Sequence, residues 1–410
     1  MRVLERSIGR DYVWPVLAAG LGIVLLSSFV AFQILRPLPT IPPTVLQPSS
    51  SVLGPTPSAL PWPHTGSAAV ALDGLGTIDS FGPQTARPLA STAKIMTALL
   101  VLEDHDLGLD QPGPLIPVTA DDVATFHREQ ADGQSVFPVA AGEQLTEYQA
   151  LQALLVPSGN NVAELLATWD AGSTTAFLDR MNLRASQLGL HQTHFADVTG
   201  VLPETVGSPH DLIGLAEVAM RKPVFAQIVA QTDANLPVAG HVYNVNADLG
   251  QDGIVGVKTG ATFAAGACLV FAADVSADQQ PARIFGVVMG VPTLDDAFTE
   301  ARSLIEAVSP ALHYRNVLST LQSLAEYQAP WGDNAFVFPQ RDINLVVYDG
   351  MSLHLRVNVR PLRAPVLSGT DVGTLTVQVG DNTLRTPLYT TYSIDEPGLF
   401  WRITRTRLFS

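Results

Sequence analysis

The hydrophobic pattern of this 410-residue chain opens with one long apolar segment. From Val13 to Leu35, 23 consecutive residues carry no charge, and as a helix they would extend about 35 Å against a hydrocarbon core of about 30 Å. Arg2, Arg6 and Arg10 precede the segment. By the positive-inside bias, residues 1–36 are predicted to form a cytoplasmic N-terminus and a single transmembrane helix, with the rest of the chain outside the cell membrane. A cleaved signal peptide is the alternative, but no small-x-small cleavage site ends the segment.

Residues 37–63 have a different character, with nine prolines among 27 positions. Proline at this density favours the extended polyproline II conformation, which rises about 3.1 Å per residue. We therefore expect a semi-rigid spacer that holds the following domain away from the membrane.

Alternating helix and strand patterns follow over residues 64–309. Small apolar residues flank a Gly-Leu-Gly turn in SAAVALDGLGTIDSF, residues 67–81, which predicts a β-hairpin. An apolar helix is predicted over residues 87–104. Residues 145–169 read as an amphipathic helix that is interrupted by Pro-Ser-Gly and then resumes. A central strand is expected from Val255, with a returning strand from Ala267.

The charge and the cysteine content exclude some classes of partner and of covalent cross-link. The formal net charge is −15, and no basic cluster, P-loop or dinucleotide-binding glycine motif interrupts the acidic background, so no nucleic-acid partner is expected. The single cysteine, Cys268, lies in the apolar run GACLVFAA. We expect it to be a small buried residue in a strand, because one cysteine forms no internal disulfide.

The stretch RPLASTAKIMTALLVLED, residues 87–104, places a serine and a lysine three positions apart on one face of an apolar helix. A serine three positions before a lysine, as in Ser91 and Lys94, can occur by chance. Lysine is scarce in this chain, however, because only three of its 23 basic residues are lysines: Lys94, Lys222 and Lys258. Burial can shift a lysine to a pKa at which it acts as a base, whereas arginine stays charged. The pair is therefore a candidate nucleophile and base.

Two further motifs carry polar groups between apolar elements. Ser158 and Asn160 lie in the interruption of the helix over residues 145–169. Lys258, Thr259 and Gly260 lie on the strand expected from Val255. Such a strand can pair with an extended substrate and offer an ammonium and a hydroxyl to its carboxylate.

In this order, the motifs Ser-x-x-Lys, Ser-x-Asn and Lys-Thr-Gly resemble the signature of the penicillin-recognising serine peptidases. Within that superfamily the chain most resembles the low-molecular-mass D-alanyl-D-alanine carboxypeptidases, a family of penicillin-binding proteins. The resemblance implies an α+β fold, with a serine β-lactamase/transpeptidase-like domain of helices and antiparallel sheet over residues 64–309. It rests on four stretches: RPLASTAKIMTALLVLE, LLVPSGNNVAELLA, FLDRMNLRASQLGLHQTHFADVTGVLP and GVKTGATFAAGACLVFAA.

The resemblance continues beyond the catalytic domain. Residues 331–398 are similar to the small β-rich domain that follows it in the family, notably at APVLSGTDVGTL, and their short alternating strands favour a β-sandwich. We expect a connecting helix over residues 310–330. Residues 399–410, LFWRITRTRLFS, resemble the start of a membrane-surface helix, a short basic amphipathic tail that would bind a membrane weakly by itself.

The resemblance also implies catalytic roles. Ser91 would attack the carbonyl of a terminal D-Ala-D-Ala bond in a peptidoglycan stem peptide and form an acyl-enzyme, and Lys94 would take the serine proton. Ser158 would relay that proton to the leaving amine. Asn160 would hold the substrate amide and help to fix Lys94. β-Lactams would acylate the same serine as covalent inhibitors, and no metal or organic cofactor is required.

The Lys-Thr-Gly strand would bind the substrate. Lys258 and Thr259 would hold the substrate carboxylate, and Gly260 would leave room for the substrate backbone. The backbone N–H groups of Ser91 and Ala261 would form the oxyanion hole, in which one donor is typically worth about 3–4 kcal/mol in the transition state.

The chain departs from the family pattern at two places. His210 stands where the family commonly has arginine, in Ser-Pro-His-Asp at residues 208–211. After IFGVVMG the family often supplies an arginine near the substrate carboxylate, whereas this chain offers Asp295 and Asp296. From the sequence alone we expect weaker binding of the peptide carboxylate.

Two other functions and one metal site deserve comparison. A class A β-lactamase would need a Glu-x-x-Leu-Asn stretch between Asn160 and Lys258, and none is present. A catalytically weak wall-binding or scaffolding protein is the third hypothesis, motivated by the missing arginines and the added β-domain. His191, His194 and Asp197 have zinc-like spacing, but no general-base glutamate pattern accompanies them.

Overall fold

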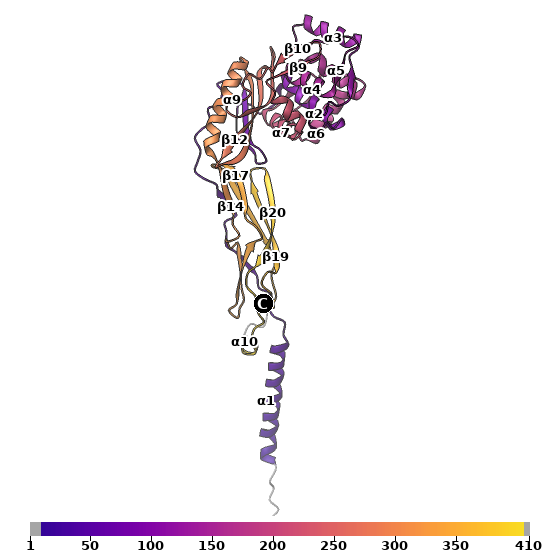
Figure 1. Ribbon diagram of the computed structural model, residues 1–410. Helices are drawn as coiled ribbons and strands as arrows, with labels where there is room; N and C mark the ends of the chain where they lie inside the picture. Colours follow the sequence, from indigo (N-terminus) through magenta and orange to yellow (C-terminus); the bar gives the residue numbers. More distant parts are fainter. Residues whose placement is uncertain (1–9, 406–410) are drawn as a thin grey trace, which may run out of the picture.

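The molecule is elongated, with two domains stacked end to end above a single projecting helix (Figure 1). The computed structural model describes the backbone of residues 10–405 and the side chains from Val13 to Arg405. Arg2 and Arg6, on which the predicted membrane orientation partly depends, lie outside the described residues. The domain that contains the serine motif lies at the far end from the projecting helix.

The projecting helix α1 covers Arg10–Leu35 and contains the predicted apolar span. Its segment Val13–Leu35 is long and apolar enough to cross a membrane, and none of it is buried inside the protein. Leu26, for example, is 64% exposed. A cleaved signal sequence close to an N-terminus has the same length and composition, so the helix by itself is weak support for a permanent anchor.

The domain that carries the serine motif is built on a five-stranded antiparallel sheet with the order β11-β12-β13-β3-β4. The predicted hairpin and the two predicted strands are confirmed, and Cys268 is buried in β12. β11 is an edge strand, so its prediction as a central strand is wrong. Its residues are nevertheless buried, because helices rather than a neighbouring strand cover them. The strands are β3 (Ser67–Leu72), β4 (Gly76–Phe81), β11 (Ile254–Thr262), β12 (Gly266–Ala277) and β13 (Gln280–Val291).

Helices cover both faces of this sheet. α9 (Leu294–Val308) packs on one face of β12 and β13, and α7 (Pro209–Met220) packs on the other face beside α2 (Lys94–Asp104). The predicted interruption of a helix is confirmed between α4 (Glu147–Leu155) and α5 (Asn160–Ala171). The other helices of the domain are η1 (Ala90–Ala93), α3 (Ala120–Ala131), α6 (Thr174–Gln187) and α8 (Pro223–Val229).

The domain also contains three separate short antiparallel pairs of strands. They are β5 (Arg87–Pro88) with β8 (Val206–Gly207), β6 (Leu115–Pro117) with β7 (Gln144–Thr146), and β9 (Asp233–Leu236) with β10 (Gly240–Tyr243). The first pair matters for the site, because β5 leads directly into η1 and fixes where that turn begins.

The second domain is the predicted β-rich domain. A seven-stranded antiparallel sheet has the order β1-β15-β16-β20-β19-β18-β2, and a separate pair joins β14 to β17. The strands from the C-terminal part of the chain are β14 (Leu312–Leu318), β15 (Ala325–Gln328), β16 (Asn334–Pro339), β17 (Ile343–Tyr348), β18 (Ser352–Val359), β19 (Asp371–Val379) and β20 (Asn382–Thr390).

The proline-rich segment, residues 37–63, is extended as predicted but is not a free spacer. Its strands β1 (Pro43–Val45) and β2 (Ser50–Val52) pair with β15 and β18, at the two opposite edges of the seven-stranded sheet. Ile41 is fully buried. Edge strands tolerate proline, because one side of an edge strand needs no N–H donors. The composition therefore suits both a spacer and an edge strand.

The connecting helix predicted over residues 310–330 is wrong. Apart from the end of the short turn η2 (Ser309–Ala311), this region contains β14 and β15. In β14 the half-buried His313 and Arg315 alternate with the exposed Tyr314 and Asn316. This alternation of every second residue is the period of a strand rather than of a helix. The β-domain therefore begins at β14 and not at residue 331.

The tail folds back toward the projecting helix. Helix α10 covers Leu399–Thr404 and packs against α1, while residues 406–410 of the predicted tail lie outside the described residues. Arg402 donates to the carbonyl of Ile34 at 3.3 Å, and Arg405 donates to the carbonyl of Gln33 at 2.6 Å. These bonds occupy carbonyls at the end of α1 that have no partner within the helix.

Candidate active site

The serine and lysine of the first motif are joined through the start of helix α2. Ala90 has a φ of 48°, which turns the chain from β5 into η1. Ser91 lies in η1, and Lys94 is the first residue of α2. Their side chains meet, with the Lys94 Nζ 2.8 Å from the Ser91 Oγ.

Lys94 is fully buried, and burial holds its pKa well below the ordinary lysine value of 10.5. The positive charge of Lys258 lowers this pKa further, while Asp197 and Glu129 oppose the shift. A lysine in this environment loses its proton more readily than a solvated one, so its neutral form can serve as a proton acceptor.

Four oxygen atoms surround the Lys94 Nζ. They are the Ser91 Oγ, the carbonyl and the Oγ of Ser158 at 3.0 and 3.2 Å, and the Oδ1 of Asn160. The Ser158 carbonyl and the Asn160 Oδ1 can only accept hydrogen bonds. A neutral amine has two N–H groups for these two acceptors, which leaves its lone pair for a hydroxyl. The geometry therefore accommodates both a neutral lysine, which receives a hydrogen bond from a serine, and an ammonium, whose third N–H donates to that serine.

The second motif is held by the break between α4 and α5. Ser158 has a φ of 66°, a left-handed conformation that is uncommon for serine, and it is only 4% exposed. Asn160 begins α5, and its Nδ2 donates to the Oε1 of Gln134 at 2.7 Å. Its backbone N–H donates to the carbonyl of Ser135 at 2.8 Å. In this structure the Asn160 amide therefore fixes Lys94 and bonds to Gln134, so its predicted contact with a substrate amide needs that bond to open.

The sequence did not indicate Gln134. It follows α3 in a polar stretch, Gln-Ala-Asp-Gly-Gln-Ser, with no periodic pattern that would place it beside α5. The connection comes from packing between α3 and α5, which brings together residues 26 positions apart.

The third motif lies on the edge strand β11. Lys258 and Thr259 are almost completely buried, and burial lowers the pKa of Lys258 to about 7. The Lys258 Nζ donates to the carbonyl of Thr259 at 3.0 Å. Because β11 pairs with a neighbouring strand on one side only, its other side can receive an extended peptide.

The structure gives a more specific reason for a glycine at position 260 than the predicted room for a substrate. A side-chain carbon built at Gly260 would lie 2.6 Å from the backbone nitrogen of Ser91 and 3.0 Å from that of Thr92. The strand β11 therefore runs directly against the turn that carries the serine. Ala261, the other predicted oxyanion-hole residue, follows on the same strand and is exposed.

The structure shows where His210 and Asp296, two residues that depart from the family pattern, make their contacts. The His210 Nδ1 is 3.1 Å from the Oγ1 of Thr77 on β4, at the edge of the sheet opposite β11. Four strand spacings, about 19 Å, separate these two edges. The carboxylate of Asp296 accepts from Thr293 as part of the capping box of α9. His210 is therefore remote from the serine motif, and Asp296 has a local structural role.

The histidine and aspartate cluster is a loop rather than a metal site. The Asp197 carboxylate accepts hydrogen bonds from Thr199, Thr205 and the backbone of Val201. Within residues 10–405, no three His, Cys, Asp or Glu side chains converge as metal ligands. Asp197 and its partners hold the loop between α6 and β8, and Gly200 of this loop approaches the carbonyl of Ala90 closely.

A serine hydrogen-bonded to a buried lysine, a second serine between two helices and a Lys-Thr-Gly edge strand define the class of penicillin-recognising serine hydrolases. A family model described as D-alanyl-D-alanine carboxypeptidase, peptidase S11, matches residues 77–293. The chain belongs to this family, as the resemblance in its sequence indicated, and it is a serine-type D-alanyl-D-alanine carboxypeptidase.

Known relatives extend the similarity across both domains. The chain is 33% identical to a D-alanyl-D-alanine carboxypeptidase of Streptomyces sp. strain K15, over 48% of this chain and 72% of that protein. It is 24% identical to the D-alanyl-D-alanine carboxypeptidase DacF of Bacillus subtilis, over 77% and 82%. The crystal structure of penicillin binding protein 5 from Haemophilus influenzae superposes with a TM-score of 0.62 at 20% identity, over 84% of this chain and all of that one. This last likeness confirms the predicted two-domain fold.

Proposed function

We propose that this carboxypeptidase is a membrane-anchored enzyme of the cell envelope, which removes the terminal D-alanine from peptidoglycan stem peptides through an acyl-enzyme on Ser91. The observation that carries the proposal is the 2.8 Å contact between the Ser91 Oγ and the Nζ of a fully buried Lys94. Burial favours the neutral amine, and a neutral amine in this position is a base for the serine hydroxyl.

Acylation then moves one proton through the site. As the Ser91 Oγ bonds to the carbonyl carbon of the D-Ala-D-Ala peptide, its proton passes to the Lys94 Nζ. The C–N bond breaks, and the proton travels from Lys94 through the Ser158 hydroxyl, 3.2 Å away, to the leaving D-alanine amine. The backbone N–H groups of Ser91 and Ala261 stabilise the oxyanion.

Deacylation reverses the path with water as the nucleophile. Lys94, again neutral, takes a proton from the attacking water and returns it to the Ser91 Oγ as the ester bond breaks. Asn160 holds Lys94 in place during both steps, and Lys258 with Thr259 binds the substrate carboxylate. β-Lactams acylate the same serine, because their strained ring supplies the reactivity that a peptide lacks.

Release of D-alanine from a peptide that ends in D-Ala-D-Ala tests this function. The full chain should release D-alanine, and the Ser91→Ala variant should release none while keeping the same circular dichroism spectrum. If the full chain released no more D-alanine than the Ser91→Ala variant, the result would favour the scaffolding hypothesis. Rapid hydrolysis of penicillin with slow peptide cleavage would favour a β-lactamase.

The membrane anchor is a separate part of the proposal. It is supported by the exposed apolar helix α1 and by the cytoplasmic orientation that the N-terminal arginines favour. Protease added to spheroplasts should digest both folded domains and leave a short membrane-bound remnant. A mature chain that starts after Leu35 would show that the helix is a cleaved signal sequence.

A further inference from the structure

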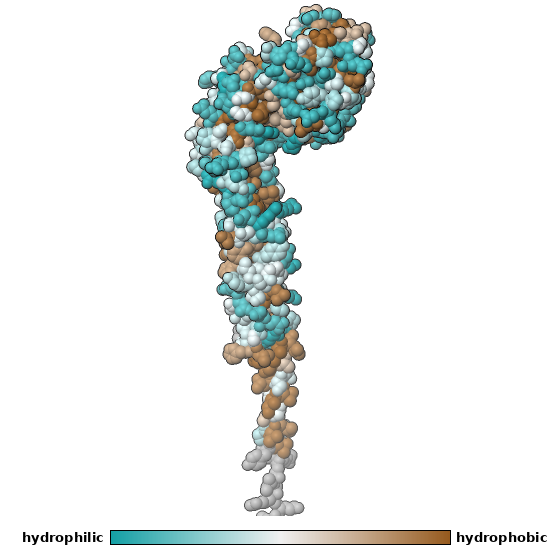
Figure 2. Space-filling view, in the orientation of Figure 1, coloured by the Kyte–Doolittle hydropathy of each residue, from teal (hydrophilic) through white to brown (hydrophobic). Residues whose placement is uncertain are grey.

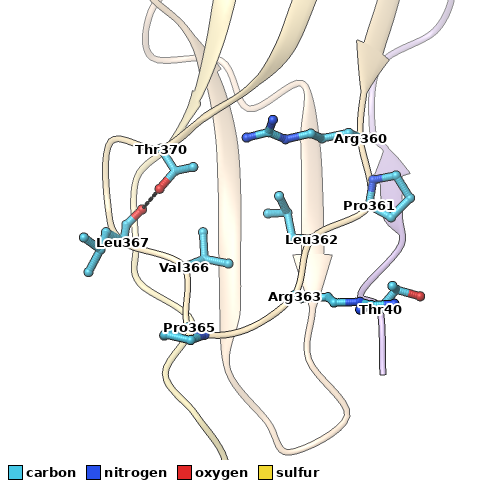
Figure 3. A pocket seen from close by; sticks show the side chains of 9 residues that line it. All are labelled: Thr40, Arg360, Pro361, Leu362, Arg363, Pro365, Val366, Leu367 and Thr370. Carbon is cyan, nitrogen blue, oxygen red and sulfur yellow. Dashed lines mark hydrogen bonds between the residues drawn. The ribbon is translucent and has the colours of Figure 1, made fainter. Parts of the chain in front are cut away.

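We propose that a pocket at the foot of the β-domain binds the phosphate of an anionic phospholipid headgroup. The pocket has a volume of about 570 Å³ and lies where the chain enters the β-domain from α1. Figure 3 shows its lining, which comes from two segments far apart in the sequence. They contribute Thr40 from the N-terminal side, and Arg360, Pro361, Leu362, Arg363, Pro365, Val366, Leu367 and Thr370 from the loop between β18 and β19.

The pocket lining is positively charged, whereas the chain as a whole is negatively charged. The protein carries a net charge of −15, yet two of the nine lining residues are arginines and none is an aspartate or glutamate. The nearest carboxylate along the chain, Asp371, accepts a hydrogen bond from the N–H of Gly373. A pocket lined by two arginines and by no carboxylate, on a protein that is acidic as a whole, offers a local site for an anion.

Both arginines keep donors for a ligand. One N–H group of Arg360 donates to the carbonyl of Asp371 at 2.7 Å, which fixes the side chain and leaves most of its five N–H donors unused by that bond. Within residues 10–405, no hydrogen bond or ion pair holds the Arg363 guanidinium. Figure 3 shows the two side chains extending in different directions from the loop, so each guanidinium by itself offers a planar fork that matches phosphate oxygens in a bidentate geometry.

The position of the pocket identifies the source of the phosphate. Thr40 follows Leu35, the last residue of α1, by five residues, which span at most about 18 Å. Reciprocal backbone hydrogen bonds between Ile41 and Leu362, at 2.8 and 3.0 Å, tie this short segment to the arginine loop. The headgroup layer extends about 5–8 Å beyond the hydrocarbon core on each side, so the pocket lies near the membrane surface if α1 spans it.

Apolar side chains at the same end support contact with lipid. Leu367, in the pocket wall, is 74% exposed, and Phe400 of α10, which packs against α1, is 81% exposed. Figure 2 shows hydrophobic surface continuing from α1 onto the adjoining end of the β-domain. A phosphate site beside exposed apolar residues suits a phospholipid, which presents an anion and acyl chains together, better than a free phosphate ion.

The identity of the ligand as a lipid rests on the proposed membrane anchor, whereas the anion site itself does not. The test uses the full chain in neutral detergent micelles, with equal amounts of phosphatidylglycerol and phosphatidylcholine, and native mass spectrometry to count the lipids that stay bound. We expect preferential retention of phosphatidylglycerol, and a loss of this preference of at least about tenfold in the Arg360→Gln/Arg363→Gln double variant. The matched control is Arg385→Gln, an exposed arginine of β20 on the same domain, which should behave as the parent.

Three outcomes would overturn the proposal. They are equal retention of the two lipids, an unchanged preference in the double variant, and complete displacement of phosphatidylglycerol by an equimolar amount of inorganic phosphate, which would indicate a free-phosphate site. D-Alanine release should be the same in all variants, because neither arginine lies near Ser91. Failure of the proposed function would appear as absent D-alanine release or a cleaved N-terminus, and neither result alters the lipid count.

Discussion

The roles proposed for two buried lysines need opposite charge states. Lys94 would act as a base only when it is neutral, whereas Lys258 would hold a carboxylate only when it is charged. Burial lowers the pKa of both, to about 7 for Lys258 and well below the ordinary value for Lys94. The unprotonated state of one and the protonated state of the other therefore coexist only within a limited range of pH.

This arrangement predicts different pH profiles for two substrates. As pH falls below the pKa of Lys94, acylation should slow for every substrate, because the base becomes protonated. As pH rises above about 7, Lys258 loses its charge and the KM for a peptide with a free carboxylate should rise, while the KM for the same peptide amidated should not. Steady-state kinetics between about pH 5 and about pH 9 would measure both limbs. Parallel KM profiles would contradict the role of Lys258.

Gly260 offers a second test at the residue scale. In the Gly260→Ala variant the new methyl group would lie 2.6 Å from the Ser91 nitrogen, so β11 or the serine turn must shift. We expect acylation by penicillin to fall by roughly 100-fold or more, the usual cost of losing an oxyanion donor. The control is Gly214→Ala in α7, where the nearest atom would be 3.6 Å away. Normal acylation in Gly260→Ala would mean that the strand and the turn are not tightly coupled.

At this scale the sequence predicts the members of the site but not their surroundings. Ser91, Lys94 and Lys258 stand out because lysine is scarce in the chain and their motifs are short and local. Gln134 has no such signal, since its contact with Asn160 depends on how α3 packs against α5. The steric need for glycine at position 260 also has no local signal in the sequence, because it arises from contact with a turn 169 residues earlier in the chain.

Helix α3 carries a buried carboxyl group that interacts electrostatically with Lys94. Glu129 is 3% exposed, and burial together with the neighbouring Glu164 raises its pKa to about 7. A carboxyl whose pKa is raised in the folded state binds more protons when folded than when unfolded, so its contribution to stability declines as pH rises from about 4.5 to about 7.

Glu129→Gln should therefore stabilise the protein at slightly alkaline pH. Above pH 7 the variant avoids a buried charge, and we expect its free energy of unfolding to exceed that of the parent by about 1–3 kcal/mol. The difference should vanish near pH 4, where the parent is protonated. Denaturant unfolding at both pH values measures it, with the exposed Glu204→Gln as the control. A destabilised variant at alkaline pH would show that the Glu129 charge is well compensated.

Element type was predictable where the pattern was long and periodic. The apolar helix α1, the interrupted helix of α4 and α5, and the hairpin of β3 and β4 follow from local patterns. β11 was misplaced to the sheet centre because a strand covered by helices is as apolar as one flanked by strands. The helix expected over residues 310–330 is wrong because its strands are short, and the alternating burial in β14 becomes clear only from its place in the fold.

At the scale of the whole molecule, residues 37–63 link helix α1 to the β-domain by joining its sheet. β1 and β2 cover the outer edges of β15 and β18, and Ile41 is fully buried. Unpaired edge strands expose backbone donors and acceptors to other chains and promote aggregation. Sequence composition did not reveal this role, because pairing with strands about 280 to 300 residues later leaves no local trace.

A soluble fragment that begins at Pro37 should therefore be more stable than one that begins at His64. Loss of the Ile41 side chain from the core alone should cost about 1.5–3 kcal/mol, and the exposed edges should promote association. Thermal unfolding with light scattering would compare the two fragments. Equal melting temperatures and equal solubility would mean that the proline-rich segment only lies along the sheet.

The central claim is that Ser91 is the residue acylated through Lys94, and covalent labelling by penicillin tests it most directly. The fragment from Pro37 onward is incubated with fluorescent penicillin and digested, and the labelled peptide is identified by mass spectrometry. The account predicts one label, on Ser91, with none in Ser91→Ala and severely slowed labelling in Lys94→Ala. A label on any other residue, or labelling that survives in Ser91→Ala, would contradict it.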